Sequence, residues 1–260
     1  SLSGSTSITA GTGVTLESLN DNTGTIALLS SGGIDGGSGT VLMRAANYAF
    51  GGADRTITTT GVLTIEPDAD ENSFASSFDN QYLNPVSVTG LTLGKSSNAS
   101  AITLSRAISL SGPVSIYGGS IDVNANITAN SGNILLDADT GSTLNQSSTG
   151  ILLDDVITIE TVTSGNLTLI GRSGDTGSGF DGIDASSANT TTLRSAGNLT
   201  LQGYSYAASG SGRGVDLNND VIAASGTVSM TGQHNTGATY AISLSGSTSI
   251  TAGTGVTLES

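Results

Sequence analysis

The chain has 260 residues, of which 37 are Gly, none is Cys or Trp, and only 11% are charged. This composition excludes a helical bundle, which needs runs of Ala, Leu, Glu and Lys, and the absence of Cys excludes disulfides and thiol chemistry. The formal net charge of −14 and the single, scattered basic residues argue against nucleic acid as a partner, because phosphates require clustered Lys and Arg. No apolar run reaches the roughly 18 residues of a membrane span, so we expect no membrane insertion.

A long internal repeat sets the organisation of the chain. The first eighteen residues, SLSGSTSITAGTGVTLES, return without a change as residues 243–260, at an offset of 242 residues. Such a repeat is typical of tandem architectures. We therefore predict that residues 1–242 form one full unit and that residues 243–260 begin the next identical unit of a longer array.

A shorter motif recurs within the unit and consists of Gly followed, directly or after one residue, by an apolar–small–apolar segment. It begins at Gly13, Gly24, Gly39, Gly61, Gly90, Gly112, Gly132, Gly165, Gly197, Gly226 and Gly255. When the first two intervals are merged as two faces of one coil, nine intervals of 20 to 33 residues remain. These intervals have the length of β-solenoid coils, so the unit is predicted to contain about nine coils.

The segments behind these glycines alternate between apolar and polar residues, as in Val114-Ser115-Ile116 and Leu167-Thr168-Leu169. A period of two predicts short strands with one buried face. Gly and Asn between them are expected at corners with positive φ. We predict an all-β fold, a parallel β-helix (β-solenoid) with loop insertions. An antiparallel sandwich is the alternative, and the scarcity of two-residue hairpin turns argues against it.

Three insertions interrupt the repeat, near residues 67–88, 171–190 and 203–214. In the first, Phe74, Phe78 and Tyr82 recur every four residues, which predicts a short amphipathic helix or lid. Its rings either cover one coil or make a lateral contact with a neighbouring fibre or a ligand. The other two are predicted to be loops that leave one corner of the coil, and such loops are where binding sites commonly lie. Their aromatic residues, expected to fold back on the coil, are Phe180, Tyr204 and Tyr206.

The first insertion also has a spacing that is similar to a calcium-binding EF-hand loop. The oxygen-bearing residues at the matching positions are Asp68, Asp70, Asn72, Ser76 and Asp79. Ser73 stands where the tight loop needs Gly, and Asp79 stands where a bidentate Glu is usual. We assign no metal, and calcium near Asp68 stays an open alternative.

An enzymatic role has little support in the residues. Polysaccharide-cleaving β-helices use paired carboxylates, and Asp154-Asp155 is such a pair, but His234 follows some three coils later, too far to converge with it. No Gly-x-Ser-x-Gly elbow is present either. We predict no catalytic residue, no cofactor and no enzyme activity, with a carbohydrate-active enzyme as the least supported alternative.

Four segments resemble the repeats of filamentous-haemagglutinin-type bacterial adhesins: SGNLTLIG (164–171), AGNLTLQG (196–203), SGTVSMTG (225–232) and NSGNILLDADTG (130–141). The resemblance covers about three quarters of the unit and leaves out the three insertions. It implies a right-handed parallel β-helix that is secreted to the bacterial cell surface and serves in attachment, aggregation or biofilm formation.

These observations lead to a structural hypothesis: the chain is a shaft segment of a giant extracellular fibre or adhesin. Identical units are expected to join head to tail through core-facing apolar residues at their two ends, which are Ile8, Val14, Leu16, Ile250, Val256 and Leu258. The alternative is a binding module whose loops grip surface glycans, cells or sister fibres, with avidity from repetition.

Overall fold

The computed structural model describes residues 7–18, 23–29, 33–52, 54–138, 148–153, 155–176, 178–186, 189–207, 209–235 and 240–260. In these ranges every regular element is a β-strand, and every paired strand is parallel to its partner. The antiparallel sandwich is therefore excluded for this part of the chain. No helix long and apolar enough to cross a membrane was found there.

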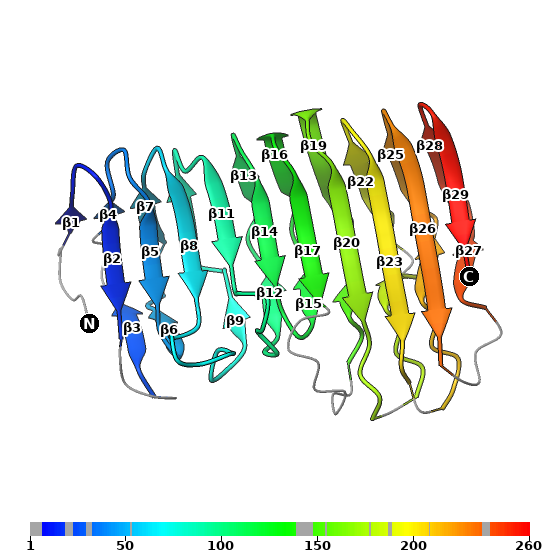
Figure 1. The fold of residues 1–260 in the computed structure, drawn as a ribbon, viewed down its shortest axis with the longest axis horizontal. Coiled ribbons are helices and arrows are strands. Elements are labelled where there is room, and N and C mark those ends of the chain that lie inside the picture. The colour runs from blue at the N-terminus through cyan, green and yellow to red at the C-terminus, as the bar shows by residue number, and fades with distance from the viewer. Residues whose placement is uncertain are drawn as a thin grey trace.

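The largest sheet has ten strands and runs the length of the molecule (Figure 1). In spatial order its strands are β2 (Val14–Glu17), β5 (Val41–Arg44), β8 (Val62–Glu66), β11 (Gly90–Leu93), β14 (Val114–Tyr117), β17 (Ile134–Ala138), β20 (Leu167–Arg172), β23 (Leu199–Ser205), β26 (Thr227–His234) and β29 (Gly255–Glu259). Ten of the eleven glycine motifs supply these strands, and the motif at Gly24 supplies a strand of another sheet.

The other strands form two pairs of shorter sheets. One pair contains β3 (Thr25–Leu28) and β6 (Asn47–Phe50), then β9 (Phe78–Asp79), β12 (Ile102–Leu104), β15 (Ile121–Val123), β18 (Ile151–Leu152), β21 (Ile183–Ala185), β24 (Val215–Asn218) and β27 (Ile242–Ser245). The other contains β1 (Ile8–Thr9), β4 (Ile34–Asp35), β7 (Arg55–Thr58) and β10 (Leu83–Val86), then β13 (Ile108–Leu110), β16 (Ile127–Ser131), β19 (Thr158–Ser164), β22 (Thr192–Ser195), β25 (Val221–Ala224) and β28 (Ser249–Ala252).

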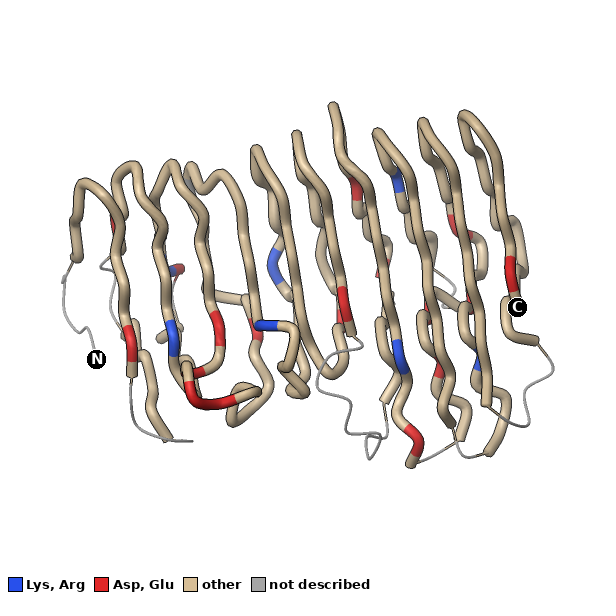
Figure 2. The backbone as a smooth tube through the Cα atoms, in the orientation of Figure 1, with Lys and Arg blue, Asp and Glu red and all other residues tan. Residues whose placement is uncertain are grey.

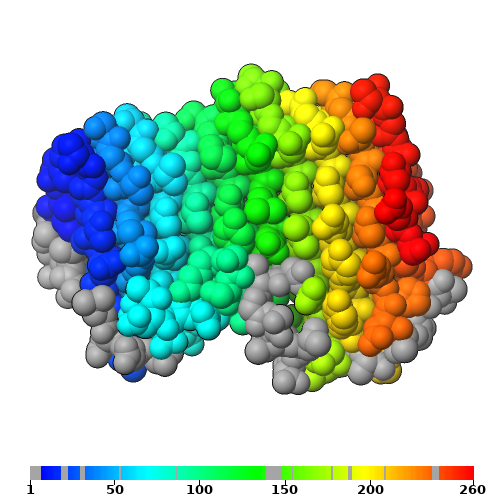
Figure 3. All heavy atoms as spheres, in the orientation of Figure 1, coloured from blue at the N-terminus to red at the C-terminus, as the bar shows by residue number. Residues whose placement is uncertain are grey.

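Every pair of hydrogen-bonded strands in the described residues joins a strand to the one three places later in the chain; the steps from β6 to β9 and from β10 to β13 are not paired. The chain therefore visits three faces in turn, which is a β-helix-like, solenoid-like arrangement. Figure 3 agrees with it, because the colours follow one another in transverse bands along the long axis. The first and last described strands, β1 and β29, lie at opposite ends (Figure 1).

The predicted alternation produces the core. Inward residues of the ten-stranded sheet stack on inward residues of the next strand, as Val114 does on Ile134 and Ile134 on Leu167. Ile116 and Leu136 continue a second column beside the first, and all five of these side chains are fully buried. Each such side chain stabilises the fold by about 1.5–3 kcal/mol relative to exposure.

Asn residues at one corner have a different role from the one predicted. The Asn133 Oδ1 accepts a hydrogen bond from the Asn166 N–H at 2.9 Å, and the Asn166 Oδ1 accepts one from the Asn198 N–H at 2.8 Å. Positive φ at a non-Gly residue occurs only at Ser87 and Asn219 within the described ranges. These corner amides therefore join successive coils through their side chains, and the expected positive φ is wrong for them.

The insertion at residues 67–88 is where both pairs of shorter sheets are interrupted, between β6 and β9 and between β10 and β13. The predicted helix is wrong: the insertion contains β9 and β10, and its described residues contain no helix. The reason lies in the hydrogen bonds, because backbone N–H groups bind the neighbouring coils. The Ala75 N–H donates to the Ala46 carbonyl at 2.8 Å, and the Phe78 N–H donates to the Ala101 carbonyl at 2.9 Å.

The other two insertions begin later than predicted, because β20 continues through Arg172 and β23 through Ser205. Tyr204 is thus a strand residue. The Tyr206 ring is half-buried and lies 5.1 Å from the guanidinium carbon of Arg172, a cation–π contact. The Ser205 hydroxyl donates to the Phe180 carbonyl at 2.7 Å. These contacts hold the two loops against each other.

Candidate unit-to-unit interface

The two copies of the repeated sequence occupy the two ends of the ten-stranded sheet. In β2, Val14 pairs with Val41 of β5, and in β29 the equivalent Val256 pairs with Val228 of β26. The copies thus have the same sequence and opposite neighbours, and each has one unpaired edge within the described structure. The same holds for β1, which pairs with β4, and β28, which pairs with β25.

At the N-terminal end, the predicted stacking residues are partly covered. Val14 is 7% exposed, while Ile8 and Leu16 are half-buried and pack against the core. A hollow of about 440 Å³ lies beside Leu16, between β2 and β3. It is lined by Thr15, Leu16, Glu17, Ser18, Thr25, Ile26, Ala27 and Leu28.

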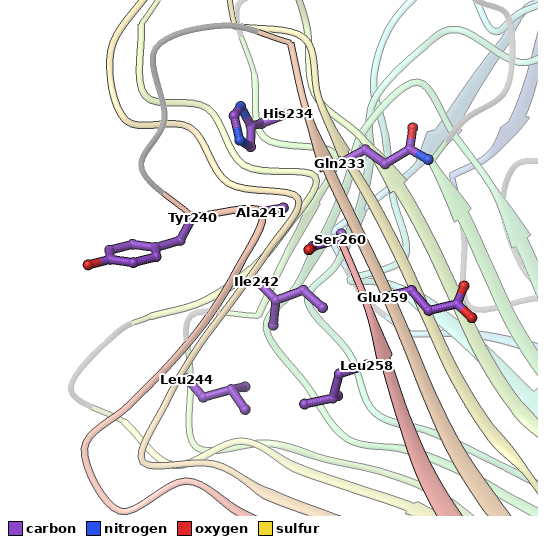
Figure 4. Close-up of a pocket in the computed structure, with 10 residues that line it drawn as sticks. Gln233, His234, Tyr240, Ala241, Ile242, Leu244, Leu258, Glu259 and Ser260 are labelled. Atoms are coloured by element: carbon purple, nitrogen blue, oxygen red, sulfur yellow. The ribbon is translucent and has the colours of Figure 1, made fainter.

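The C-terminal end is more open. Val256 and Leu258 are each 49% exposed and Leu244 is 42% exposed, while Ile250 is half-buried. A hollow of about 810 Å³ lies there, and Figure 4 shows Ile242, Leu244 and Leu258 gathered beside it. Large exposed apolar side chains are uncommon on a covered solenoid, so their concentration marks this end as a candidate interface.

The terminal strand β2 carries an ion-pair network across the sheet. Glu17, Arg44 and Glu66 are in register on β2, β5 and β8. The Arg44 Nη1 donates to the Glu17 Oε1 at 2.9 Å, and its Nε donates to the Glu66 Oε1. The hydrogen bond to Glu66 has the largest effect on the pKa of Arg44, and together with the hydrogen bond to Glu17 it raises that pKa. At the other end Glu259, the copy of Glu17, pairs in register with Thr231 and forms no ion pair with described residues.

The aromatic rings considered for a lateral contact lie largely inside the structure. Phe74 and Phe78 are each 4% exposed, and Tyr82 is half-buried. The ring centroids of Phe74 and Phe78 lie 5.7 and 5.6 Å from that of Tyr48, in edge-to-face geometry. The structure therefore uses the two Phe rings to fill the core where the sheets are interrupted.

The residues with EF-hand-like spacing do not form a group of three carboxylates close enough to share a metal ion; among the described residues such a group occurs elsewhere. The Asp68 side chain is buried and its Oδ1 accepts a hydrogen bond from the Ala69 N–H at 2.6 Å. The Lys95 ammonium donates to the carbonyls of Asp68, at 3.1 Å, and Glu71. The ammonium group of Lys95 therefore already binds the backbone carbonyl oxygens of this turn.

An acidic cluster that the sequence analysis missed lies on the face of β21 and β24. Carboxylate oxygens of Asp181, Asp184 and Asp216 lie within 4.8 Å of one another, close enough to share a metal ion. Burial, with the nearby charges of Asp184 and Asp216, raises the pKa of Asp181 to about 7. Arg213 offsets this repulsion, since its N–H donates to Asp181 and its guanidinium pairs with Asp216. The available signal was the recurrence of Ile183-Asp184 as Val215-Asp216, which the register aligns.

The structure describes two of the three residues considered for catalysis, Asp155 and His234. Asp154 lies outside the described residues, Asp155 is exposed, and His234 is an exposed residue at the end of β26 that lines the C-terminal hollow. Basic residues occur singly along the backbone (Figure 2).

Comparison with known proteins adds no family: no family model matches the chain, and neither the curated proteins nor the solved structures gave a match. The chain is an all-β, solenoid-like stack of parallel sheets, with strands of the same repeated sequence at its two ends.

Proposed function

We propose that the chain is a shaft segment of a giant extracellular bacterial fibre or adhesin, in which 242-residue units stack head to tail. The single observation that carries this proposal is the position of the repeat. Two strands that contain the sequence Val-Thr-Leu-Glu begin and end one continuous ten-stranded sheet. Each has one edge that no described residue pairs with, and this edge is directed away from the unit. A unit that starts and ends on the same strand can be continued without a change of register.

The proposal includes a right-handed β-helix of about nine coils per unit. Nine intervals separate the ten strands of the large sheet, and each strand pairs with the third strand after it. Right-handed connections between parallel strands of one sheet are strongly preferred, because strand twist favours them. At about 4.8 Å per coil, one unit adds about 43 Å to the shaft.

Two further properties suit an extracellular shaft. Continuous parallel ladders leave few backbone groups unpaired along the rod, which favours stiffness and resistance to proteolysis. The net charge of −14 keeps long polymers apart by repulsion. Location at the cell surface rests on the resemblance of segments such as SGNLTLIG to bacterial adhesin repeats.

The test is the length of chains that contain one, two and three units, measured in solution by small-angle X-ray scattering and as images by electron microscopy. We expect straight rods whose length grows by about 43 Å per added unit. The matched control carries Val256→Asp and Leu258→Asp at the junction, where buried carboxylates should turn the rigid joint into a hinge. Units that move independently in the unmodified chain would overturn the proposal.

A further inference from the structure

The open edge of β27 is the third unpaired edge at the C-terminal end. Residues 243–245 of β27 repeat residues 1–3, which lie outside the described residues, so the first copy does not show the outer partner of this strand. For the other two faces, the copy supplies the answer: β29 repeats β2, whose outer partner is β5, and β28 repeats β1, whose outer partner is β4. β27 (Ile242–Ser245) is bonded to β24 alone within the described structure. Its second neighbour has to come from a segment that follows Ser260 in an array.

The chain order identifies that neighbour. β3 follows β2 directly in the sequence. Among the described residues β3 is bonded only to β6, so its other edge has no described partner at the N-terminal end. Once β29 takes the place of β2, the next strand on the face of β27 is β3 of the following unit. The two hollows lie at matching positions, one between β2 and β3 and the other beside β27 and β29.

The side chains on the two edges agree in chemistry. Ile26 and Leu28 point into the core, at 8% and 5% exposure, and alternate with the outer residues Thr25 and Ala27. On β27, Ile242 is half-buried, Leu244 is 42% exposed, and both lie beside the hollow with Leu258 (Figure 4). Apolar side chains at alternate positions on both strands allow one column to continue into the other.

We propose that β27 and the hollow beside it are the seat for β3 of a second copy of the unit, with Ile26 on Ile242 and Leu28 on Leu244. This inference rests on the proposed head-to-tail function and names its third contact. In the same joint Glu259 takes the place of Glu17 beside Arg44 of the following copy, so an ion pair accompanies the apolar contact. The occupant is a repeat of this chain, because only β3 combines the right position in the chain with the matching alternation.

The experiment uses a two-unit chain, in which residues 19–260 are added after Ser260. Ser243→Cys is combined with Ala27→Cys in the second unit. The proposed register makes these residues direct neighbours on adjacent parallel strands, about 4.8 Å apart, within the Cα range of a disulfide. The chain has no Cys of its own, so no other thiol competes. We expect the majority of molecules to become cross-linked under mild oxidation, seen as a mobility shift on a non-reducing gel.

The matched control pairs Ser243→Cys with Thr25→Cys of the second unit, two residues out of register and about 6.6 Å further along the strand. It should give almost no cross-link, and a cross-link there in place of the first would overturn the register. Scattering on the reduced chains separates the two proposals. A rod of doubled length without the Ala27 cross-link overturns the seat and leaves the shaft intact, whereas two independently moving units overturn both.

Discussion

The same twelve residues, 7–18 and 249–260, stand at the two ends of this molecule and differ there in almost every structural property. β1 has two residues and β28 has four, although their sequences are identical. Their partners explain the difference, since β4 has two residues and β25 has four. The length of a strand in this stack is therefore set by the neighbouring strand on which it forms.

Exposure and close contacts change in the same way. Val14 is 7% exposed and Val256 is 49% exposed. A Cβ on Gly253 would lie 1.9 Å from the Ser225 carbonyl oxygen, while a Cβ on Gly11 would have no atom within 4 Å. The N-terminal copy shows the contacts to the strands that follow it, and the C-terminal copy shows the contacts to the strands that precede it. In the proposed joint between units, one copy makes both sets of contacts.

Substitution of the paired glycines is expected to give the largest difference. Gly253→Ala forces a backbone clash and should destabilise the C-terminal end by about 2–4 kcal/mol, whereas Gly11→Ala should change stability by less than about 0.5 kcal/mol. Hydrogen exchange of the β28 and β29 amides measures the effect of Gly253→Ala. The same amides are measured in the Gly11→Ala variant, which is the control. Equal effects of the two substitutions would show that the two glycines have equivalent surroundings, which would contradict the difference between the ends.

Charge placed on the stacking valines is expected to have the next largest effect. Val14→Asp buries a carboxylate beside Val41 and should reduce protection of β2 and β5 by about 2–3 kcal/mol. Val256→Asp leaves the carboxylate half in water and should cost less than about 1 kcal/mol in the single unit. Urea titration with hydrogen exchange distinguishes the two variants. In a two-unit chain the second variant should become as damaging as the first, and a persistently mild effect there contradicts the joint.

The C-terminal end should also respond to pH through Asp220. Burial raises its pKa to about 6, and its backbone N–H and carbonyl face Thr248 and Ser249, which lead into β28. The groups around its carboxylate are the N–H donors of Thr191 and Asn218 and the charges of Asp184 and Asp216.

Because the folded pKa lies above the unfolded value, the folded state binds the proton more tightly and stability falls as pH rises from about 4 to about 6. Because the Asp220 side chain is fully buried, the shift from 3.8 to about 6 corresponds to a loss on the order of 2–3 kcal/mol. The measurement is exchange of β25 and β28 amides corrected for intrinsic rates. Asp220→Asn should reduce this pH dependence at β25 and β28 and leave the part due to Asp181, whose raised pKa acts in the same direction. A slope that is unchanged in the variant argues against Asp220 as a source.

The smallest difference is expected for the two copies of the glutamate. Glu17→Gln removes one partner of Arg44, and because both side chains are 34% exposed, it should cost about 0.5 kcal/mol and less at high salt. Glu259→Gln should have no measurable effect in a single unit, since Glu259 forms no ion pair in the described structure. Thermal unfolding at low and high salt compares them.

Local pattern predicted the regular part of the fold. Segments such as Val114-Ser115-Ile116 and Leu167-Thr168-Leu169 are strands with buried apolar residues, as their alternation indicates. The interval between glycines located the ten strands of the largest sheet, because each coil has to return to the same face. The prediction of a helix near Phe74 was wrong because its pattern is not specific to a helix. Aromatic residues at intervals of four also occur where an irregular segment packs its rings into a core.

The candidate interface was predictable in its residues and not in its geometry. The duplicated sequence identified Val14 and Val256 as equivalent, but the hollow beside β27 is lined by residues from three separated segments, and no local pattern joins them. The acidic cluster of Asp181, Asp184 and Asp216 arises in the same way, from parallel register between distant strands.

The all-β fold, the alternation of apolar residues and the identity of the two end sequences could all be predicted from the amino-acid sequence alone. Each of these properties follows from spacing along the chain, which steric period and repetition control. The length of each strand, the burial of one copy rather than the other, and the pairing of Glu17 with Arg44 could be seen only in the folded chain. Those properties depend on which strand lies alongside, and in a parallel stack that neighbour is always a full coil away in sequence.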